Sequence, residues 1–261
     1  MSEDFKYTFR IKRYNPEEKG LKQAPHYVDY EVEGDADMTL LDGLNKVQSD
    51  DPTLAFRWSC RMGICGSDGM LVNGQPVLAC SVFCKDVAKK KQGRLEIEVD
   101  PMRNMPILKD LITDIDDPMD KMRAVAPYLD RMDKDGPEDG PGKQSKKQLE
   151  RIKKTSQCVK CMLCYSACPV YGQDKDFVGP AASALAYRYT ADSRDDQGGG
   201  RVDKVIGKED SVWGCSFVGE CSVACPKRVD PAQAVQRLKV MGALRLVTKP
   251  ISDMIKKRKK K

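Results

Sequence analysis

The chain has 261 residues, with eleven cysteines and with 45 lysines and arginines against 39 aspartates and glutamates. No stretch reaches the roughly 20 consecutive apolar residues of a membrane-spanning helix, so the sequence predicts no span of its own. The six positive charges of Lys256–Lys261 account for the whole excess, and the balanced remainder argues against a nucleic-acid-binding face.

The N-terminus and the cysteines predict an intracellular protein. Met1–Lys6 is polar and has no apolar signal-peptide core, and the absence of an Arg- and Ser-rich presequence suggests a prokaryotic or already processed protein. In a reducing compartment, closely spaced cysteines bind metal more often than they form disulfides. We therefore expect the cysteines to bind metal.

The first hundred residues predict a small sheet with one helix. Apolar and polar positions alternate in three segments, which indicates half-buried strands at Tyr7–Arg13, Tyr27–Val32 and Leu95–Val99. Thr39 can cap a short helix whose apolar residues are Leu40, Leu41, Leu44 and Val47. Asn73-Gly74 separates two short apolar segments and predicts a hairpin turn.

Beyond Asp110 the strand signals stop and the sequence becomes helical. Glycines and prolines make Asp135–Gly142 a predicted connector, and Gly198–Gly200 predicts a loop. Pro180 starts one helix-like run. Asp230 and Pro231 would provide the N-cap and the first-turn proline of a C-terminal amphipathic helix.

Three cysteine ladders follow one another along the chain. The first has the spacing of plant-type [2Fe–2S] proteins, with an aspartate in the third position: Cys60-x4-Cys65-x2-Asp68-x11-Cys80. The second is the bacterial ferredoxin pattern, and the third resembles it: Cys158-x2-Cys161-x2-Cys164-x3-Cys168-Pro169 and Cys215-x5-Cys221-x3-Cys225-Pro226. Because thiolates are the preferred ligands of iron in sulfide clusters, the spacing predicts three iron–sulfur clusters.

Crossed ligation divides the last two ladders between two clusters, because the fourth cysteine of the bacterial pattern binds the other cluster. This rule assigns a [4Fe–4S] cluster to Cys158, Cys161, Cys164 and Cys225. It leaves three thiolates for the other cluster, Cys168, Cys215 and Cys221, and Val218 stands where a further cysteine would be expected. Since valine cannot hold a fourth iron, the sequence predicts a [3Fe–4S] cluster there.

Two alternatives stay open. A structural zinc site is one, although zinc sites close with four ligands and seldom repeat the Cys-Pro signature. The other concerns the [2Fe–2S] site, where Cys84 could replace Asp68 as the fourth ligand. We favour Asp68, because Cys84 is equally well explained as a small buried apolar residue.

The motifs and element patterns together predict an α+β chain of two domains. Residues 1–108 would form a β-grasp domain of the plant-type ferredoxin kind, which carries the [2Fe–2S] cluster. Residues 109–261 would form an all-α, bacterial-ferredoxin-like domain with the [4Fe–4S] and [3Fe–4S] clusters, and a linker is expected at about 133–148.

These residues resemble the iron–sulfur subunit of succinate dehydrogenase and fumarate reductase, the succinate:quinone oxidoreductases. The likeness covers nearly the whole chain and is carried by Phe56–Met70, Phe177–Ala182, Asp192–Asp195, Cys215–Cys221 and Cys225–Pro231. It implies an electron relay between a covalently bound FAD of a partner flavoprotein and a quinone. No residue of this chain would be catalytic, because the dicarboxylate chemistry would take place on the flavoprotein.

The resemblance also implies a quinone pocket next to the [3Fe–4S] cluster, shared with membrane-anchor subunits. Its lining here would be Pro169, Ser216, Phe217, Gln236 and Lys239. Gln236 and Lys239 share a face of the predicted C-terminal helix, which could instead be a solvated polar face. Ubiquinone-type relatives usually carry His at position 216 and Trp shortly after Pro169. The chain has neither, which favours menaquinone.

A subunit of this kind would be peripheral, on the cytoplasmic face of the prokaryotic inner membrane. The basic C-terminus could help it to dock on anionic lipid or could simply be solvated. An iron–sulfur adaptor of another flavoprotein dehydrogenase is the alternative function, but such adaptors add cysteine-rich modules, and none of the 36 residues after Cys225 is a cysteine. Succinate oxidation and fumarate reduction both stay open as the direction of catalysis.

Overall fold

The computed structural model describes residues 5–18, 24–131, 140, 142–207 and 211–259, without the side chains of residue 249 and residues 251–259. It contains two compact units. The first is Met1–Asp116 with Val159–Ala167, and the second is Asp117–Cys158 with Cys168–Lys261. The domain boundary predicted at residue 108 stays a prediction. The two compact units of the structure meet in sequence between Asp116 and Asp117.

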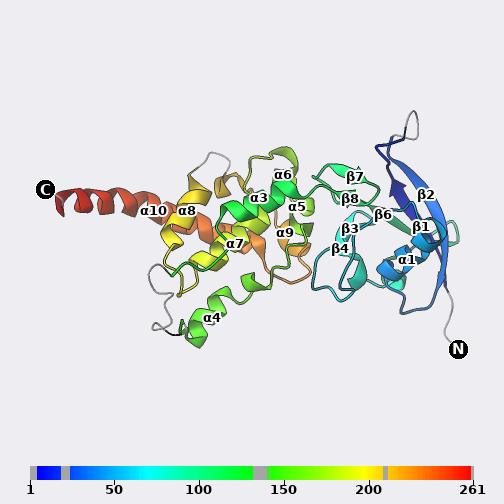
Figure 1. Ribbon diagram of the computed structural model, residues 1–261, viewed down its shortest axis with the longest axis horizontal. Helices are drawn as coiled ribbons and strands as arrows, with labels where there is room; N and C mark the ends of the chain where they lie inside the picture. Colours follow the sequence, from blue (N-terminus) through cyan, green and yellow to red (C-terminus); the bar gives the residue numbers. More distant parts are fainter. Residues whose placement is uncertain (1–4, 19–23, 132–139, 141, 208–210, 260–261) are drawn as a thin grey trace. The chain divides into compact units, whose positions relative to one another are not determined.

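A six-stranded mixed sheet forms the centre of the first unit (Figure 1). Five strands follow the order β2-β1-β6-β3-β4, and the sixth, β5, pairs with β6. Its strands are β1 (Phe5–Arg13), β2 (His26–Gly34), β3 (Gly69–Val72), β4 (Gln75–Leu78), β5 (Lys89–Lys91) and β6 (Arg94–Asp100). Strands β1 and β6 pair in parallel, and the other pairs are antiparallel. The three predicted strands are therefore confirmed.

The hairpin between β3 and β4 turns at Asn73 and Gly74, as predicted. Their φ angles of 50° and 82° are both positive, which is the conformation that tight hairpin turns favour and that Asn-Gly adopts readily. A second, two-stranded sheet pairs β7 (Ile107–Lys109) with β8 (Ile112–Thr113). The expectation that strands stop at Asp110 is thus wrong, because a two-residue strand is too short to show an alternating pattern.

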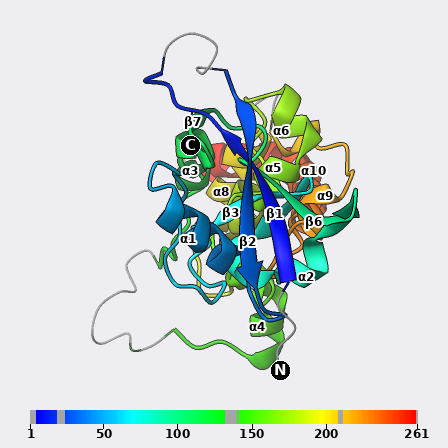
Figure 2. The same cartoon turned by 90° about the vertical axis from the view of Figure 1, so that its right-hand side faces the viewer.

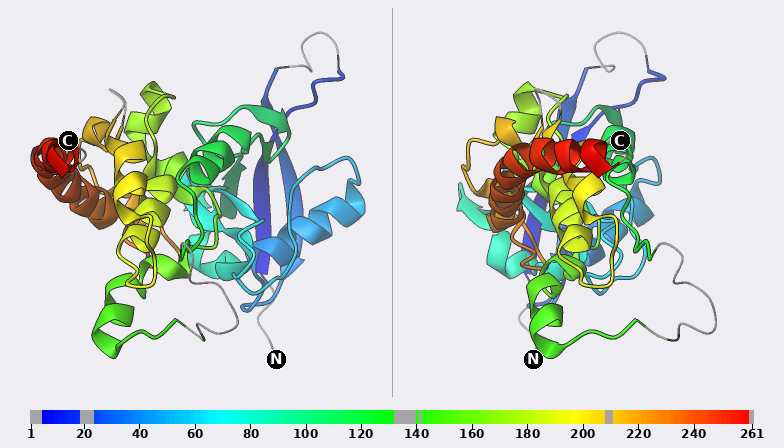
Figure 3. Two further views of the ribbon diagram at one scale, coloured as in Figure 1. Left: turned by 60° about the vertical axis from the view of Figure 1, so that its left-hand side comes forward. Right: turned by 90° about the vertical axis from the view of Figure 1, so that its left-hand side faces the viewer.

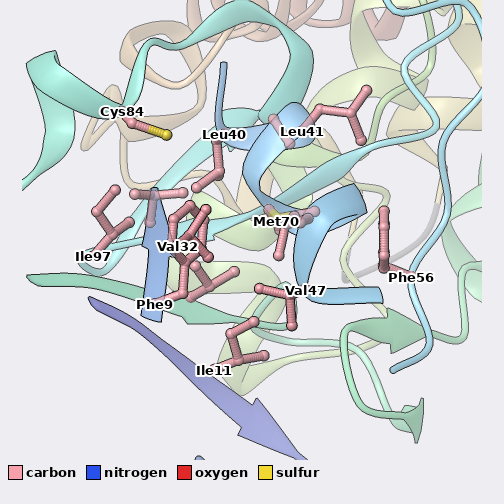
Figure 4. Close-up of a cluster of buried hydrophobic side chains, with 14 of the residues drawn as sticks. Phe9, Ile11, Val32, Leu40, Leu41, Val47, Phe56, Met70, Cys84 and Ile97 are labelled. Atoms are coloured by element: carbon pink, nitrogen blue, oxygen red, sulfur yellow. The ribbon is translucent and has the colours of Figure 1, made fainter. Parts of the chain in front are cut away.

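Helix α1 (Leu40–Asp50) covers one face of this sheet (Figure 2). Thr39 caps it, and a capping box joins the Thr39 and Asp42 side chains to each other's backbone N–H groups. Its buried apolar residues meet those of the sheet, among them Phe9 and Ile97 (Figure 4). Short helices η2 (Ala79–Ser81) and α2 (Cys84–Val87) follow β4, and α5 (Leu163–Ala167) completes the unit.

All of the elements described in the second unit are helical. They are α3 (Asp116–Ala124), α4 (Lys146–Ile152), η4 (Thr155–Gln157), α6 (Pro169–Gln173), α7 (Pro180–Thr190), α8 (Gly198–Ile206), η5 (Val212–Gly214), α9 (Glu220–Val223) and α10 (Pro231–Lys259). Helix α10 packs against α7 and α8 through its first half (Figure 3). The predicted helix starts at Pro180 and Pro231 are confirmed, and Asp230 caps α10 by accepting from the backbone N–H of Gln233 at 3.1 Å.

Gly198–Gly200 is not a loop, as the sequence suggested, but the first turn of α8. The reason lies in tertiary packing. The guanidinium of Arg245 lies so close to Gly199 that a Cβ there would stand 2.9 Å from it, and this guanidinium also pairs with Asp203 of α8 at 2.8 Å. Contacts of this kind override the low intrinsic helix propensity of glycine. The predicted connector at Asp135–Gly142 lies mostly outside the described residues.

Buried ion pairs stabilise the second unit around Asp192 and Asp195. Arg201, with 2% of its surface exposed, donates to both carboxylate oxygens of Asp195 at 2.7 and 3.1 Å. Arg188 and Arg194 donate to Asp192 at 2.7 and 2.8 Å. Burial alone would raise the pKa of Asp192, but the hydrogen bonds from Arg194 and Arg188 lower it to about 2. Removing one partner of such a pair typically costs about 3–5 kcal/mol of stability.

Candidate iron–sulfur sites

The loop between Cys60 and Cys65 surrounds its sulfur atoms with backbone donors. The N–H groups of Met62, Ile64 and Cys65 donate to Sγ of Cys60 at 3.3–3.4 Å, and that of Gly63 donates to Sγ of Cys80 at 3.2 Å. These hydrogen bonds, the one from Met62 first, lower the pKa of Cys60 to about 6. The loop therefore stabilises the thiolate of Cys60, which is the form that binds iron, whereas burial and the neighbouring Asp68 raise the pKa of Cys80.

Asp68 stands at the end of the same loop and is buried, with 2% of its surface exposed. Its Oδ2 accepts from the backbone N–H of Cys80 at 2.6 Å. Its Oδ1 is buried and has no hydrogen-bond partner among the residues that the structure describes. A buried carboxylate oxygen without a partner is costly, and an iron ion bound there would remove that cost.

Cys84 lies in a different environment. It is fully buried in the apolar core of the first unit, near Leu40 (Figure 4). Burial raises the pKa of its thiol to about 12. This is the environment of a structural cysteine, and it supports Asp68 over Cys84 as the fourth ligand.

Cys161 of the second cysteine ladder packs against the loop that follows Cys65 of the first. Gly66 has a φ of 71°, and a Cβ on it would stand 2.8 Å from Cβ of Cys161. Gly69 is nearly as close, since a Cβ there would lie 3.1 Å from the carbonyl oxygen of Cys161. Only glycine permits this approach, and no spacing rule predicted it. Within the first unit, a ligand of the predicted [4Fe–4S] cluster thus contacts the [2Fe–2S] loop.

The remaining predicted [4Fe–4S] ligands are divided between the units. Cys164 joins Cys161 in the first unit, whereas Cys158 and Cys225 belong to the second. Sγ of Cys225 accepts from the backbone N–H of Val229 at 3.3 Å, so this sulfur too has a backbone donor. The set of four stays a prediction from spacing.

Cys168, Cys215 and Cys221 all lie in the second unit and are near one another. Burial first, and then the neighbouring sulfurs of Cys168 and Cys215, raise the pKa of Cys221 to about 12. Two sulfurs have backbone donors, because Tyr171 donates to Cys168 and Phe217 to Cys215, each at 3.4 Å. The thiols of Cys168 and Cys221 would ionise only when a positive charge, such as iron, balances them.

Val218 lies in the loop between Cys215 and Cys221 and is 58% exposed. The residues on either side of it have positive φ angles, 60° at Phe217 and 89° at Gly219.

Among the residues that the structure describes, no three His, Cys, Asp or Glu side chains converge as they would around one metal ion. Ligands of a cluster bind different iron atoms and stand farther apart than those of a single ion.

Three of the predicted quinone residues, Ser216, Phe217 and Lys239, lie in or contact the loop between Cys215 and Cys221. Lys239 of α10 donates from Nζ to the carbonyl oxygen of Cys215 at 2.7 Å. Gln236, one turn earlier, has a buried Nε2 for which the described part of the chain provides no hydrogen-bond partner. Ser216 and Phe217 are exposed, and Pro169 is exposed at the start of α6.

An exposed apolar patch surrounds the first cysteine loop and was not predicted. Trp58, Met62 and Ile64 are 38%, 71% and 58% exposed. The guanidinium of Arg61 lies 4.5 Å from the ring centroid of Trp58. A patch of this kind is typical of a surface that a partner covers.

Comparisons with known proteins agree with the site geometry. Residues 8–120 match the family described as a 2Fe-2S iron-sulfur cluster binding domain, and residues 154–229 match a 4Fe-4S dicluster domain. The chain is 48% identical to the fumarate reductase iron-sulfur subunit of Mycobacterium tuberculosis, over 92% of this chain and 94% of that protein. It belongs to the family of iron–sulfur subunits of fumarate reductase and succinate dehydrogenase.

A second relative and one solved structure extend these comparisons, the relative in sequence and the structure in fold. The succinate dehydrogenase iron-sulfur subunit of Coxiella burnetii is 34% identical over 89% of this chain and 95% of its own length. A chain of the solved structure called "Mycobacterium smegmatis Sdh1 complex in the apo form" has a TM-score of 0.77 at 23% identity, covering 93% of this chain and 98% of that one. The predicted α+β fold class is confirmed.

Family membership establishes the general role of the chain. It is an electron-transfer subunit of a fumarate reductase or succinate dehydrogenase complex, with [2Fe–2S] and [4Fe–4S] dicluster domains. This membership favours the main prediction over the adaptor of another flavoprotein dehydrogenase. Among the described residues, no helix is both long and apolar enough to cross a membrane.

Proposed function

We propose that the chain relays electrons between the covalently bound FAD of a partner flavoprotein and menaquinone, by way of [2Fe–2S], [4Fe–4S] and [3Fe–4S] clusters in that order. When bound, the clusters would supply one-electron steps between the flavin and the quinone. The observation that carries the proposal is the packing of Cys161 against Gly66, because it brings ligands of the first two clusters together.

In this proposal Cys60, Cys65, Asp68 and Cys80 hold the [2Fe–2S] cluster. The backbone donors around Cys60 and Cys80 support it, because N–H groups directed at sulfur stabilise the anionic ligands and adjust the reduction potential. The buried Oδ1 of Asp68 supports a carboxylate ligand. Carboxylate is a harder donor than thiolate and stabilises ferric iron.

The other two sets follow the crossed assignment. Cys158, Cys161, Cys164 and Cys225 would hold the [4Fe–4S] cluster, and Cys168, Cys215 and Cys221 the [3Fe–4S] cluster. The mutual proximity of the last three thiols supports this assignment. Val218 offers no fourth ligand, which supports three irons over four.

For the partners, we infer that the flavoprotein covers the patch of Trp58, Met62 and Ile64 beside the [2Fe–2S] loop. Such a contact would bury about a few hundred Å² of apolar surface here and would exclude water from the path between flavin and cluster. Anchor subunits with the quinone would contact the loop around Cys215.

At the quinone site, Gln236 and Lys239 would donate hydrogen bonds to the quinone carbonyl oxygens. The unpartnered Nε2 of Gln236 supports this role, since a buried amide without an acceptor is destabilising until a ligand provides one. Lys239 has two further N–H donors besides the one used for Cys215. Ser216, Phe217 and Pro169 would complete the lining, and Ser216 in place of His favours menaquinone.

The proposed location is the cytoplasmic face of the prokaryotic inner membrane. Of the basic C-terminus, Lys260 and Lys261 lie outside the described residues, and only the backbone is described for residues 256–259. The predicted docking of this tail on anionic lipid is therefore part of the proposal and rests on charge alone.

Low-temperature EPR with metal analysis tests the relay. We expect a [3Fe–4S] signal in the oxidised chain, a [2Fe–2S] signal after dithionite, and about nine irons per chain. Zinc without an EPR signal would refute it.

For the quinone, the purified complex should turn over menaquinone analogues at least tenfold faster than ubiquinone analogues, and the reverse preference would overturn the menaquinone assignment.

A further inference from the structure

A strongly basic cavity lies in the second unit, and the relay proposed above assigns no role to the side chains that line it. It borders the Cys225 loop, because the lining residue Val229 donates its backbone N–H to Sγ of Cys225. Its volume is about 770 Å³, within the range of small-molecule sites. Helix α4, helix η4, the turn at Lys227–Asp230, the start of α10 and Tyr187 of α7 line it. The lining comes from two stretches that are about 70 residues apart, 147–157 and 227–237, together with Tyr187, so no local motif marks the cavity.

Seven of the lining residues are lysine or arginine, and only two are acidic. Both acidic groups already have partners: Glu150 lies 3.7 Å from Lys153, and Asp230 accepts from Ser222 and Gln233 as the cap of α10. Most of the cations, by contrast, have no ion-pair partner among the described residues: Lys147, Arg151, Lys154, Lys227 and Arg228.

This local imbalance is unusual for this chain. Outside Lys256–Lys261, the chain carries equal numbers of positive and negative residues. Like charges that line one concave surface repel each other, and the low-dielectric walls of a cavity strengthen the resulting field. A bound anion would remove this repulsion.

We propose that this basic cavity binds a ligand with two or more phosphate groups. Five lining cations have no ion-pair partner among the described residues, which is enough to balance two phosphodiesters or the three or more negative charges of a diphosphate. Arg151 and Arg228 suit phosphate because a guanidinium can donate two parallel hydrogen bonds to its oxygens. The same chemistry is offered by soluble diphosphates and by lipid headgroups with two phosphates.

Calorimetric titration of the cluster-loaded full chain with inorganic pyrophosphate at low ionic strength tests the proposal. We expect micromolar binding, weakened at least tenfold by the double substitution Arg151→Gln and Arg228→Gln. The matched control, Lys89→Gln with Lys90→Gln on the exposed strand β5, removes the same charge elsewhere and should leave the affinity unchanged. Unchanged EPR spectra would show that both variants keep their clusters.

Three outcomes would overturn the proposal: no binding of pyrophosphate, equal weakening by the cavity and control variants, or equal affinity for citrate, which would indicate attraction by charge alone. If the arginine variant does not fold, Lys147→Gln with Lys227→Gln removes two other cations of the cavity and should weaken binding in the same way.

Vesicles distinguish the two sources of phosphate. Phosphatidylcholine vesicles with and without cardiolipin are sedimented with the unchanged chain and both variants. A loss of cardiolipin-dependent binding in the cavity variant alone would identify a lipid headgroup as the ligand. Equal vesicle binding by both variants, together with loss of pyrophosphate binding in the cavity variant alone, would identify a soluble diphosphate.

Discussion

The Cys60–Cys65 loop and the predicted [3Fe–4S] set differ in how they affect the pKa of a cysteine. In the loop from Cys60 to Cys65, three backbone N–H groups donate to one sulfur, and the pKa of Cys60 falls to about 6. In the second unit, burial raises the pKa of Cys221 to about 12, and Cys168 is shifted in the same direction for the same reason.

The difference separates two ways of preparing a cluster site. The first loop stabilises the thiolate of Cys60 by its own backbone, so this ligand is ready before iron arrives, whereas burial raises the pKa of Cys80 in the same site. Burial raises the pKa of Cys168 and Cys221, so these two thiols ionise only together with iron binding. We therefore expect the first site to depend on the donors and on Asp68, and the second to depend on which side chains surround the cluster.

The largest effect is expected from Val218→Cys. A fourth thiolate between Cys215 and Cys221 would hold a fourth iron, so the oxidised [3Fe–4S] EPR signal should disappear and iron content should rise by about one per chain. The added negative charge should lower the midpoint potential. Val223→Cys, at a 79% exposed position just outside this loop, is the control and should leave the signal unchanged. A persistent [3Fe–4S] signal in Val218→Cys would contradict the assignment.

Asp68→Ala should selectively abolish the [2Fe–2S] signal of the reduced chain. It removes the carboxylate ligand and the acceptor for the Cys80 N–H, while Asp68→Cys should restore a cluster with altered g-values.

Cys84→Ala should keep full iron content and cost about 1–3 kcal/mol of stability, measured by denaturant unfolding, through the small cavity it leaves. Loss of the cluster in Cys84→Ala would make Cys84 the ligand instead.

The same two loops show what sequence can and cannot reveal. Ligand spacing and hairpin chemistry are local, so the strands around Asn73-Gly74 and the family of the chain could be predicted. Gly66 was not recognised as the contact point of Cys161, because nothing in its neighbours marks a close approach from a segment about 95 residues away.

Two further features depended on tertiary structure in the same way. Gly198–Gly200 became helical through contacts with Arg245 of α10, against the preference of its own residues. The basic cavity gathers lysines and arginines from two stretches, residues 147–154 and 227–237, each of which resembles an ordinary solvated charge run when taken alone. A direct signal for either would require knowledge of which helices pack together.

A smaller effect, confined to the quinone end of the relay, is expected from Lys239→Ala. Loss of a charged donor to a reacting oxygen typically lowers turnover by roughly 100-fold. Quinone turnover of the complex should fall by that order, whereas succinate oxidation with an artificial dye should be retained. The control is Lys204→Ala, an exposed lysine on α8. Equal losses in both assays would instead assign Lys239 to the support of the Cys215 loop, whose carbonyl it contacts.

The smallest expected effect is a difference in thiol reactivity within the cluster-free chain. The thiolate is the form that reacts with iodoacetamide, so a pKa near 6 leaves Cys60 mostly reactive at pH 7.5, whereas a pKa near 12 leaves Cys221 mostly protonated. Labelling of Cys60, followed by peptide mass spectrometry, should be at least tenfold faster. Its rate should fall as the pH drops through about 6, while Cys221 stays slow over this range. In urea the two rates should become equal, because the backbone donors and the burial are both lost; unequal rates there, or equal rates in the native state, would refute the proposed contrast between the loops.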